Sequence, residues 1–410
     1  MDEVRDGFQP EEGRGADGYE LLAGAAGEES SDQGPTLKVI CSSGELAEGV
    51  SLVAHAVSER NPLAILTHIL MTADSTGLRL SASDLELGIS LRVAADVVEA
   101  GAVTVPARFL SELLSSMPEG EVNVSADRSY ASRVFCPGSD YMIFGLPPHE
   151  YPVLPEVDTE HSFFVPQKLL RSAIRQTSFA VSAEKKGRPI LTGVLLDYEG
   201  PMVTLVATDT TRLALRSIPV TSGTEAMQAI VPVRALNEVL RSLTDDAGDV
   251  EVRLSAKQAR FVTPRGVEVT TRLIEGQYPG YRRVIPTTWN VRLTMPTAAA
   301  LAAVRRVSVV AKNCAYRVEC STKDDRLLIR VESSTDGSAH EEVELIREGD
   351  DIQVGLNSQY LLDVLSAMEH EGFVIEFSDP LRPCVVRPKY GEGEPTDGEF
   401  LCVLMPMQLS

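Results

Sequence analysis

The sequence predicts an α+β protein made of three tandem repeats, each with two helices on one side of an antiparallel sheet. A strand–turn–strand hairpin recurs along the chain. Residues 77–93 read GLRLSASDLELGISLRV and residues 202–216 read MVTLVATDTTRLALR, with a weaker third copy at 326–345. A hairpin that returns at so long a period indicates tandem domains.

Helix spacing predicts the same organisation. Segments with apolar residues at helical spacing begin near residues 45, 166 and 296, and a second series begins near 106, 232 and 357. The steps are 121 and 130 residues in the first series and 126 and 125 in the second. We therefore expect an N-terminal tail and three domains, with the bounds 1–35, 36–157, 158–288 and 289–410.

Residues 1–35 differ in composition from the rest of the chain. Ten acidic residues face two basic ones, and Gly and Ser fill much of the remainder. This composition predicts an acidic, disordered tail. The tail contains GRGADG at 13–18, which formally matches a dinucleotide-binding motif, but it follows no predicted strand and opens no predicted helix.

The composition excludes several classes of protein. A net charge of −21 argues against binding of nucleic acid by bulk charge. The six cysteines form no Cys-x-x-Cys pair and the six histidines no His-x-x-x-His pair, so no metal site and no cofactor is predicted. Scattered thiols, no signal peptide and no long apolar run predict a soluble, cytoplasmic protein.

The charge is unevenly distributed. Residues 165–181 and 295–312 each carry +3, the six predicted helices together carry +4, and the rest of the chain therefore carries −25. Ordinary solvated helix faces also carry Lys and Arg. The contrast nevertheless indicates two surfaces of opposite charge. If the helices share one surface, that surface is the one that phosphate groups would tolerate.

Several stretches closely resemble the bacterial DNA polymerase III β subunit, or β sliding clamp, family over residues 36–410. They are NPLAILTHIL (61–70), SASDLELGI (81–89), RPILTGVLL (188–196), VATDTTRLA (206–214), RLIEGQYPGYRRVIP (272–286), NSQYLLDVL (357–365) and VLMPMQL (403–409).

The resemblance implies three clamp domains per chain and a head-to-tail homodimeric ring around duplex DNA. It implies a non-catalytic processivity subunit of the DNA polymerase III holoenzyme, a DNA-directed DNA polymerase complex, acting in DNA replication. The DNA would be bound without sequence preference. The replicative polymerase, the clamp loader, and repair and translesion factors would bind through short peptides, with no membrane and no cofactor involved.

The resemblance also implies three sets of site residues. The peptide-binding pocket falls on Leu191, Thr208, Thr210, Thr211, Arg212, Leu213, Pro279, Val284, Tyr360, Leu381, Pro383, Val403, Met405, Pro406 and Met407. The DNA-binding candidates, which combine the resemblance with the basic helices, are Arg60, Lys168, Arg171, Arg175, Lys185, Lys186, Arg305 and Arg306. The dimer interface falls on Tyr141, Ile143, Val309 and Val310.

The sequence departs from the family pattern in three places. Thr210-Thr211 stands where family members often have Gly-His or another residue followed by an aromatic one. Two β-branched residues would stiffen this wall of the peptide-binding pocket. Ser410 extends the chain beyond the usual closing Leu, and the acidic leader is not general to the family. Ligand preference is therefore left open.

Three other functions compete with the clamp. An enzyme could use the repeated Asp84 and Asp209, but carboxylates in equivalent places of separate domains should lie too far apart for paired acid–base chemistry, so a turn-stabilising role is expected. An interaction scaffold could keep the fold without closing a ring. A specialised duplicate clamp could tolerate an inhibitor aimed at the pocket.

Overall fold

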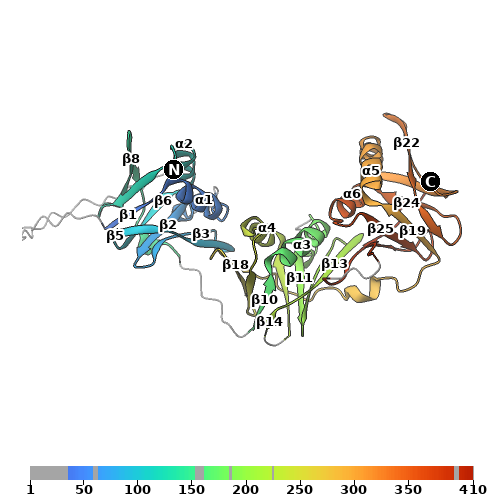
Figure 1. The fold of residues 1–410 in the computed structure, drawn as a ribbon, viewed down its shortest axis with the longest axis horizontal. Helices are drawn as coiled ribbons and strands as arrows, with labels where there is room; N and C mark the ends of the chain where they lie inside the picture. Colours follow the sequence, from blue (N-terminus) through green and yellow to red (C-terminus); the bar gives the residue numbers. More distant parts are fainter. Residues whose placement is uncertain are drawn as a thin grey trace, which may run out of the picture. The chain divides into compact units, whose positions relative to one another are not determined.

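Three rounds of one element order make up the described chain. The structure is a computed structural model, and it describes residues 36–58, 63–152, 161–183, 187–223, 226–391 and 397–409. Each round, which we call a repeat, has one strand, one α-helix, five strands, a second α-helix and three strands (Figure 1). The predicted tail, Arg60, Lys185, Lys186 and Ser410 lie outside the described residues.

The elements have the following bounds. The first repeat contains β1 (Leu37–Ser42), α1 (Ser43–Ala54), η1 (Ala64–Thr67), β2 (His68–Asp74), β3 (Gly77–Ser83), β4 (Leu87–Val93), β5 (Ala95–Glu99), β6 (Gly101–Pro106), α2 (Ala107–Ser116), β7 (Glu121–Ala126), β8 (Ala131–Cys136) and β9 (Ser139–Phe144), followed by η2 (Pro148–Glu150). The second contains β10 (His161–Pro166), α3 (Gln167–Thr177), η3 (Ser178–Ala180), η4 (Pro189–Thr192), β11 (Gly193–Glu199), β12 (Met202–Thr208), β13 (Arg212–Pro219), β14 (Ser222–Gly223), β15 (Met227–Pro232), α4 (Val233–Ser242), β16 (Asp249–Leu254), β17 (Gln258–Val262) and β18 (Glu268–Arg272), followed by η5 (Tyr281–Val284). The third contains β19 (Val291–Pro296), α5 (Thr297–Ala311), η6 (Lys312–Cys314), β20 (Arg317–Lys323), β21 (Arg326–Ser333), β22 (Gly337–Glu344), β23 (Ile346–Glu348), β24 (Gln353–Asn357), α6 (Ser358–Ser366), β25 (Gly372–Phe377), β26 (Cys384–Pro388) and β27 (Phe400–Leu404).

The helices begin within two residues of the predicted starts. A proline directly precedes α2, α3, α4 and α5, where its restricted φ and missing N–H end a strand and allow a helix to begin. Helix α6 begins differently. The Asn357 side chain accepts hydrogen bonds from the backbone N–H groups of Gln359 (2.9 Å) and Tyr360 (3.2 Å), which is the usual N-cap interaction.

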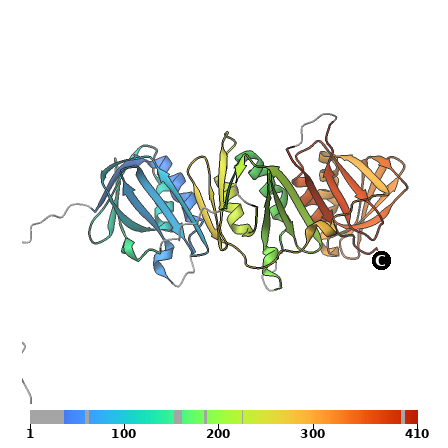
Figure 2. The ribbon, with the colours of Figure 1, turned by 90° about the horizontal axis from the view of Figure 1, so that it is seen from below.

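The strands form four antiparallel sheets, two of which cross from one repeat to the next. The strand orders are β5-β1-β7-β8-β9, β14-β10-β16-β17-β18-β4-β3-β2-β6, β15-β11-β12-β13-β27-β26-β25-β19-β23 and β22-β21-β20-β24. In the second sheet β4 of the first repeat runs beside β18 of the second (Figure 2). Ile89 of β4 lies opposite Val269 of β18. In the third sheet Ala214 of β13 lies opposite Cys402 of β27.

Each repeat therefore divides its strands between two sheets. One part has five strands and ends at β9, β18 or β27, and the other has four strands and ends at β4, β13 or β22. Within the described chain, β18 pairs with β4 and β27 pairs with β13, which gives sheets of nine strands. Among the described residues, no strand pairs with the corresponding edges of β9 and β22.

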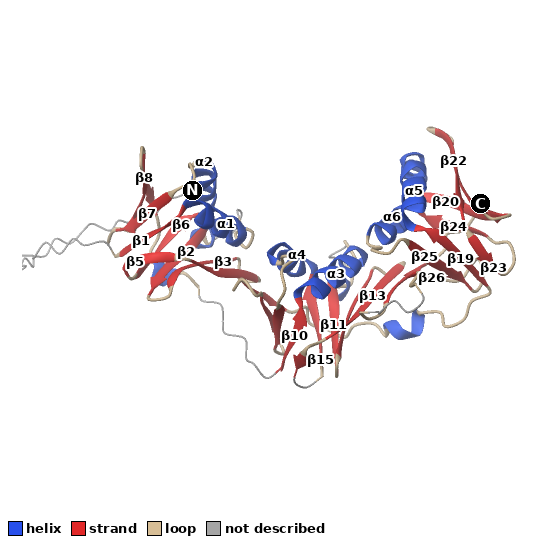
Figure 3. Cartoon of the chain, viewed as in Figure 1, coloured by secondary structure: helices blue, strands red, loops and turns tan. Residues whose placement is uncertain are grey.

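Helices of neighbouring repeats pack on the same face of these sheets (Figure 3). Ile89, Val269, Ala214 and Cys402 all belong to one apolar core cluster, which also contains the buried residues of the helices. Because opposed residues on paired strands point to one face, this face continues across each junction between repeats. Direct contacts agree, since Ser172 of α3 donates to Glu369, just after α6, at 3.0 Å.

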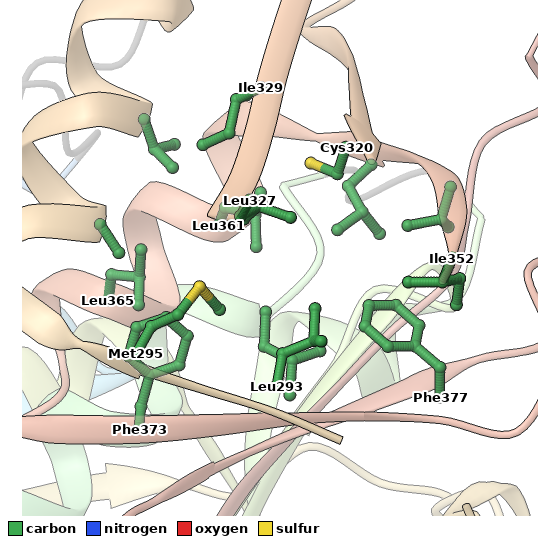
Figure 4. A pocket seen from close by; sticks show the side chains of 15 residues that line it. Leu293, Met295, Cys320, Leu327, Ile329, Ile352, Leu361, Leu365, Phe373 and Phe377 are labelled. Carbon is green, nitrogen blue, oxygen red and sulfur yellow. The ribbon is translucent and has the colours of Figure 1, made fainter. Parts of the chain in front are cut away.

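The core of the third repeat contains a small apolar void. Leu293, Met295, Leu361 and Phe373 converge on it with other aliphatic side chains (Figure 4), and its volume is about 20 Å³. A space of that size holds at most one water and offers no polar side chain to bind one, so it is expected to be dry. We assign it to packing and not to function.

The repeated Ser/Thr-Asp step shapes two equivalent turns. Asp84 Oδ1 accepts from the N–H groups of Glu86 and Leu87, at 3.0 and 2.8 Å. Asp209 Oδ1 accepts from the corresponding groups of Thr211 and Arg212, at 2.9 and 3.0 Å. These contacts confirm the turn-stabilising role expected for both aspartates.

The same turns hold a non-glycine residue in the left-handed region. Leu85 has φ 78° and Thr210 has φ 80°. This conformation costs an L-residue roughly 1–2 kcal/mol, and a β-branched side chain makes it worse. The Thr210 N–H also donates to Thr208 Oγ1 at 3.1 Å, so the turn is held in place by its neighbours.

We predict that Thr210→Gly stabilises the protein. Glycine removes the left-handed strain but adds about 0.5–1 kcal/mol of unfolded-state entropy, so the net gain should be about 0.5 kcal/mol. The thermal unfolding midpoint should rise by about 1–2 °C. The matched control is Thr211→Gly, which loses the Oγ1 bond to Asp209 (2.6 Å) and should lower the midpoint. Equal destabilisation by both substitutions would show that the turn is not strained.

Candidate functional site

A pocket lies where the turn of residues 208–211 meets the C-terminal strand. Pairing of β13 with β27 places Arg212 opposite Leu404 and Leu213 opposite Val403. The chain then continues past the turn, and the Met405 N–H donates to the Thr211 carbonyl oxygen at 2.9 Å. The third repeat thus contributes its last residues to a site that begins in the second.

The pocket has a volume of about 220 Å³. It is lined by Arg188, Thr208, Thr210, Thr211, Arg212, Leu213, Pro279, Gly280, Tyr281, Val284, Pro383, Val403 and Met405. Ten of these thirteen residues belong to the predicted peptide-binding set. The structure therefore brings together residues that are more than 200 positions apart in the sequence.

The floor of the pocket is a separate apolar cluster on the sheet face opposite the helices. Leu191, Leu213 and Val403 are 3–4% exposed within it, together with Tyr278 and Tyr281. The Tyr278 hydroxyl donates to the carbonyl oxygen of Val206 at 3.3 Å. Leu191 lies in this floor beneath the pocket and does not line it.

Tyr281 keeps its hydroxyl protonated. It donates to Asp197 Oδ2 at 2.8 Å, and the Asp197 side chain is 5% exposed. Burial raises the pKa of Tyr281 far above its usual value, and the hydrogen bond and negative charge of Asp197 raise that pKa further. The ring therefore has a fixed orientation at the pocket wall.

The rim contains large apolar side chains exposed to solvent. Val284 is 54% and Met405 45% exposed. The predicted residue Leu381 does not line the pocket; it is 74% exposed and lies two residues before the lining residue Pro383. Pro406 and Met407 follow along the chain, and the Met407 N–H donates to the Gly355 carbonyl oxygen at 2.8 Å, which holds this segment against the third repeat. An apolar floor with apolar rim residues suits a short peptide with one or two large apolar anchors.

Arg212 is the most highly connected residue of the site. Its side chain is 11% exposed, Nε donates to Asp209 Oδ2 at 3.0 Å, and Nη1 donates to Asp363 Oδ2 on α6 at 2.5 Å. Nη2 donates to the Phe179 carbonyl oxygen at 2.7 Å, and the guanidinium lies 4.3 Å from the ring centroid of Tyr360. Arg212 therefore joins the second repeat to the third as well as lining the pocket.

Tyr360 lies beside the pocket on α6. Its hydroxyl accepts a hydrogen bond from Thr211 Oγ1 at 3.1 Å. The Thr210-Thr211 departure from the family pattern thus has a structural consequence, because Thr211 binds a residue of the adjoining repeat. A residue without a hydroxyl at position 211 would leave this contact unmade.

The sequence prediction left out three lining residues. Gly280 and Tyr281 lie in YPGYRRVIP, and Arg188 ends the basic segment KKGR. Tyr281 had a readable signal, since it follows the Tyr278-Pro279 step by two residues. Its partner Asp197 had none, because nothing in the sequence connects β11 to this loop.

The repeated aspartates bind arginines at two different junctions. Asp84 Oδ2 is in ion-pair contact with Nη1 of Arg234 on α4. Asp209 instead binds Arg212, whose guanidinium extends to the third repeat. Each carboxylate is occupied by its own turn and its own arginine, so the two do not form an acid–base pair.

The predicted basic residues lie on α3 and α5. Lys168 and Arg175 on α3, and Arg305 on α5, are exposed. Arg171 is in ion-pair contact with Asp245, and Arg306 donates to both carboxylate oxygens of Glu341, at 2.7 and 2.5 Å. The two paired arginines therefore present less net charge than the sequence count suggests.

The predicted interface residues divide into exposed and buried ones. Tyr141 is 39% and Val309 76% exposed, whereas Ile143 is 5% exposed and Val310 packs partly against the core. Met142 and Phe144, on the other face of β9, are 56% and 77% exposed. The edge strand β9 thus carries more exposed apolar surface than the sequence prediction named.

Two searches of the described residues complete the survey. No group of three or more His, Cys, Asp or Glu side chains in this part of the chain is arranged to hold a metal ion. No described helix is long and apolar enough to cross a membrane.

Comparisons with known proteins follow the same three-part division. Family models described as the N-terminal, central and C-terminal domains of the DNA polymerase III beta subunit match residues 37–155, 164–280 and 282–408. The beta sliding clamp of Streptomyces coelicolor is 33% identical over 374 residues, covering 89% of this chain and 97% of that protein. The beta sliding clamp of Staphylococcus aureus is 30% identical over 344 residues, covering 82% and 91%.

A solved structure agrees with these matches. The DNA polymerase sliding clamp of Bacillus subtilis superposes with a TM-score of 0.84 at 27% identity, covering 92% of this chain and all of that one. Three repeats of one α+β domain, joined edge to edge, define a clamp-type architecture. The chain belongs to the DNA polymerase III beta subunit family, the bacterial sliding clamps. Its function is that of a DNA sliding clamp in replication, which is a non-catalytic role.

Proposed function

We propose that two copies of this chain close head to tail into a ring that encircles duplex DNA and tethers replication proteins to it. The observation that carries the proposal is the pair of strand edges, on β9 and β22, that no strand in the described ranges pairs with. Strand β9 ends a five-stranded sheet and β22 ends a four-stranded sheet, and joining them would make the nine-stranded sheet found at both internal junctions. We call this joint between two subunits the seam.

The proposed seam contains the predicted interface residues. Tyr141 and Ile143 belong to β9, and Val309 and Val310 belong to α5, which packs over β22. Pairing the edges would cover the exposed apolar side chains of β9 and remove an edge that invites aggregation. Ile143 would contribute through its backbone, because its side chain already lies in the core.

The helix side is the surface proposed to face DNA. Lys168, Arg175 and Arg305 would contact phosphates without reading the sequence, with Arg171, Arg306 and the residues outside the described ranges, Arg60, Lys185 and Lys186, as further candidates. A closed ring holds DNA topologically, so few cations are needed and sliding is not hindered by strong binding. The net charge of −21 then disfavours contact with DNA elsewhere.

The pocket is the proposed docking site for partner peptides. Its lining residues, together with Leu191, Tyr360, Leu381, Pro406 and Met407 around them, would take large apolar anchors, each worth roughly 1.5–3 kcal/mol when buried. Met405 and Met407 can adapt to different shapes. The replicative polymerase, the clamp loader, and repair and translesion factors would thus use one site in turn.

The organisation and location of the protein follow as further proposals. We place the domain bounds at 36–157, 158–288 and 289–410, after an acidic tail of residues 1–35. The family-model matches at 37–155, 164–280 and 282–408 support these bounds. A cytoplasmic location is supported by six cysteines that form no disulfide bond.

We predict retention of this protein on nicked circular DNA and its loss after linearisation. A ring held topologically remains on a circle but slides off a free end, whereas a protein bound by charge dissociates equally from both. The measurement is gel filtration of clamp that a clamp loader has placed on the DNA, at about 0.2 M salt, where phosphate contacts alone are weakened. Equal retention on both forms would favour the non-closing scaffold.

We predict that carboxylates in the pocket abolish peptide binding. Leu213→Asp places a charge in the floor of the pocket, and Val284→Asp places one at the rim, where the side chain is 54% exposed and a charge remains solvated. The affinity for a clamp-binding peptide, measured by fluorescence anisotropy, should fall at least about tenfold for both. The control is Val98→Asp, at a position 60% exposed on β5. Undiminished affinity in Val284→Asp and Leu213→Asp would remove the pocket assignment.

We predict that carboxylates at the seam give monomers. Tyr141→Asp and Val309→Asp each place a negative charge on a surface that the ring would bury, so sedimentation should shift from dimer to monomer at micromolar concentration. Val98→Asp again serves as the control and should remain dimeric. A dimer that survives both seam substitutions would place the subunit contact elsewhere.

A further inference from the structure

A second groove lies beside the pocket, on the same sheet face opposite the helices. Its volume is about 510 Å³. One wall is formed by residues 285–289, which link η5 to β19, and the rest by side chains on and beside β19, β25, β26 and β27. We call it the linker groove. None of the residues that line it belongs to the predicted site sets.

The pocket and the linker groove follow one another along the same two strands. In β27, Val403 lines the pocket and Leu401 lines the groove. Beside it, Pro383 lines the pocket and Val385 of β26 lines the groove. Alternate residues of a strand point to the same face, and two positions span about 7 Å. The two sites are therefore neighbours on one continuous surface.

The two sites also share a floor and a wall. Val385 and Leu401, which are 1% and 2% exposed, belong to the same apolar cluster as Val403 and Tyr281 in the pocket. In the wall, Tyr281 lines the pocket and the next residue, Arg282, lines the groove, with its guanidinium 4.9 Å from the ring centroid of Tyr281. A chain that leaves the pocket along β27 thus enters the groove directly.

The charged side chains of the groove are already paired. Arg387 donates to Glu399 Oε1 at 2.7 Å and to Glu376 Oε2 at 3.3 Å. Glu376 Oε1 in turn lies 3.2 Å from Arg292 Nη2. Arg282 is within ion-pair distance of two carboxylates of β11. Because each arginine that lines the groove has a carboxylate partner, charge does not select the ligand.

The apolar part of the groove is its loop wall. Trp289, the single tryptophan of the sequence, is 38% exposed. The Arg292 guanidinium lies 5.2 Å from its ring centroid, which holds the indole in place. Ile285 and Pro286 are half-buried in the same wall. A large, partly exposed indole in a groove suits a flat aromatic side chain.

We infer that partner peptides extend beyond the pocket into the linker groove and place an aromatic side chain against Trp289. This inference rests on the proposed docking of partner peptides in the pocket. An extended peptide advances about 3.4 Å per residue, so the aromatic residue stands roughly two to four positions from the deepest anchor. A partner without such a residue uses the pocket alone, and the groove therefore sorts partners by the sequence that flanks their anchors.

The single tryptophan allows the groove to be observed separately from the pocket. The probes are synthetic peptides without tryptophan, blocked at both ends. A short core peptide has adjacent Leu and Phe anchors. Extended peptides add a tail of Ser residues at the amino or the carboxyl end, with one Phe placed two, three or four positions from the anchors. The matched peptides have Ser in place of that Phe.

Two measurements report on the groove. By calorimetry, the best Phe-bearing extended peptide should bind about three- to tenfold more tightly than its Ser match. The gain should be the same at about 0.1 M and about 0.5 M salt, because paired charges do not contribute to it. That peptide should also protect Trp289 from quenching by acrylamide, whereas the core peptide should not.

Substitutions assign the gain to the indole. Trp289→Ala should remove the gain from the Phe-bearing peptide and leave the affinity for the core peptide unchanged, and Trp289→Phe should retain part of the gain. The matched control is Phe109→Ala, which removes another exposed aromatic side chain, on α2, and should keep the full gain. Val284→Asp should abolish binding of core and extended peptides alike, because the groove only adds to the pocket.

The outcomes separate this inference from the proposed docking. If the core peptide binds but no Phe-bearing peptide gains, the pocket assignment stands and the inference is wrong. A gain that survives Trp289→Ala, or that disappears at high salt, would also overturn the inference. If the core peptide does not bind at all, the proposed docking itself is wrong.

Discussion

The structure depends on edge-to-edge pairing of strands from consecutive repeats. Each repeat splits its nine strands into groups of five and four, and neither group is closed on itself. An unpaired edge exposes N–H and carbonyl groups that need partners. The next repeat supplies them, at β4–β18 and again at β13–β27. This single requirement fixes the direction of the chain from repeat to repeat and places helices α1 to α6 on one face of the joined sheets.

The same pairing creates the candidate binding site. At β13–β27 the turn of the second repeat meets the last residues of the third, and an apolar floor forms on the face opposite the helices. Arg212 lies at this point on the other face and binds Asp363 and the Phe179 carbonyl oxygen. The pocket and the junction are therefore one structure, and a ligand that moved the wall of the pocket would act on a residue that holds two repeats together.

Much of this fold could be predicted from the sequence. The helix starts were within two residues, since proline and apolar spacing mark them, and the turn role of Asp84 and Asp209 was readable from residue type alone. Most of the pocket residues came from the family resemblance rather than from the pattern. Alternating apolar residues do not reveal which strands are neighbours, so the division into groups of five and four could not be predicted. The inward orientation of the Ile143 side chain and the contact of Tyr281 with Asp197 depend on that strand order, so neither could be predicted from the sequence.

The central claim is that the seam repeats the internal junctions. Ala339 lies opposite the core residue Val331 as Ile89 lies opposite the core residue Ala82, so a seam paired like β4 with β18 would place Ala339 opposite Tyr141. Crosslinking of that pair tests the claim most directly. Residues directly opposite one another on paired antiparallel strands have Cα atoms about 4.5–5.5 Å apart, within the range of a disulfide bond. A chain with Tyr141→Cys and Ala339→Cys should form a covalently closed dimer on oxidation, seen on a non-reducing denaturing gel. A chain with Tyr141→Cys and His340→Cys, shifted by one residue and pointing to opposite faces, should not. Crosslinking of the shifted pair, or of neither pair, would contradict the account.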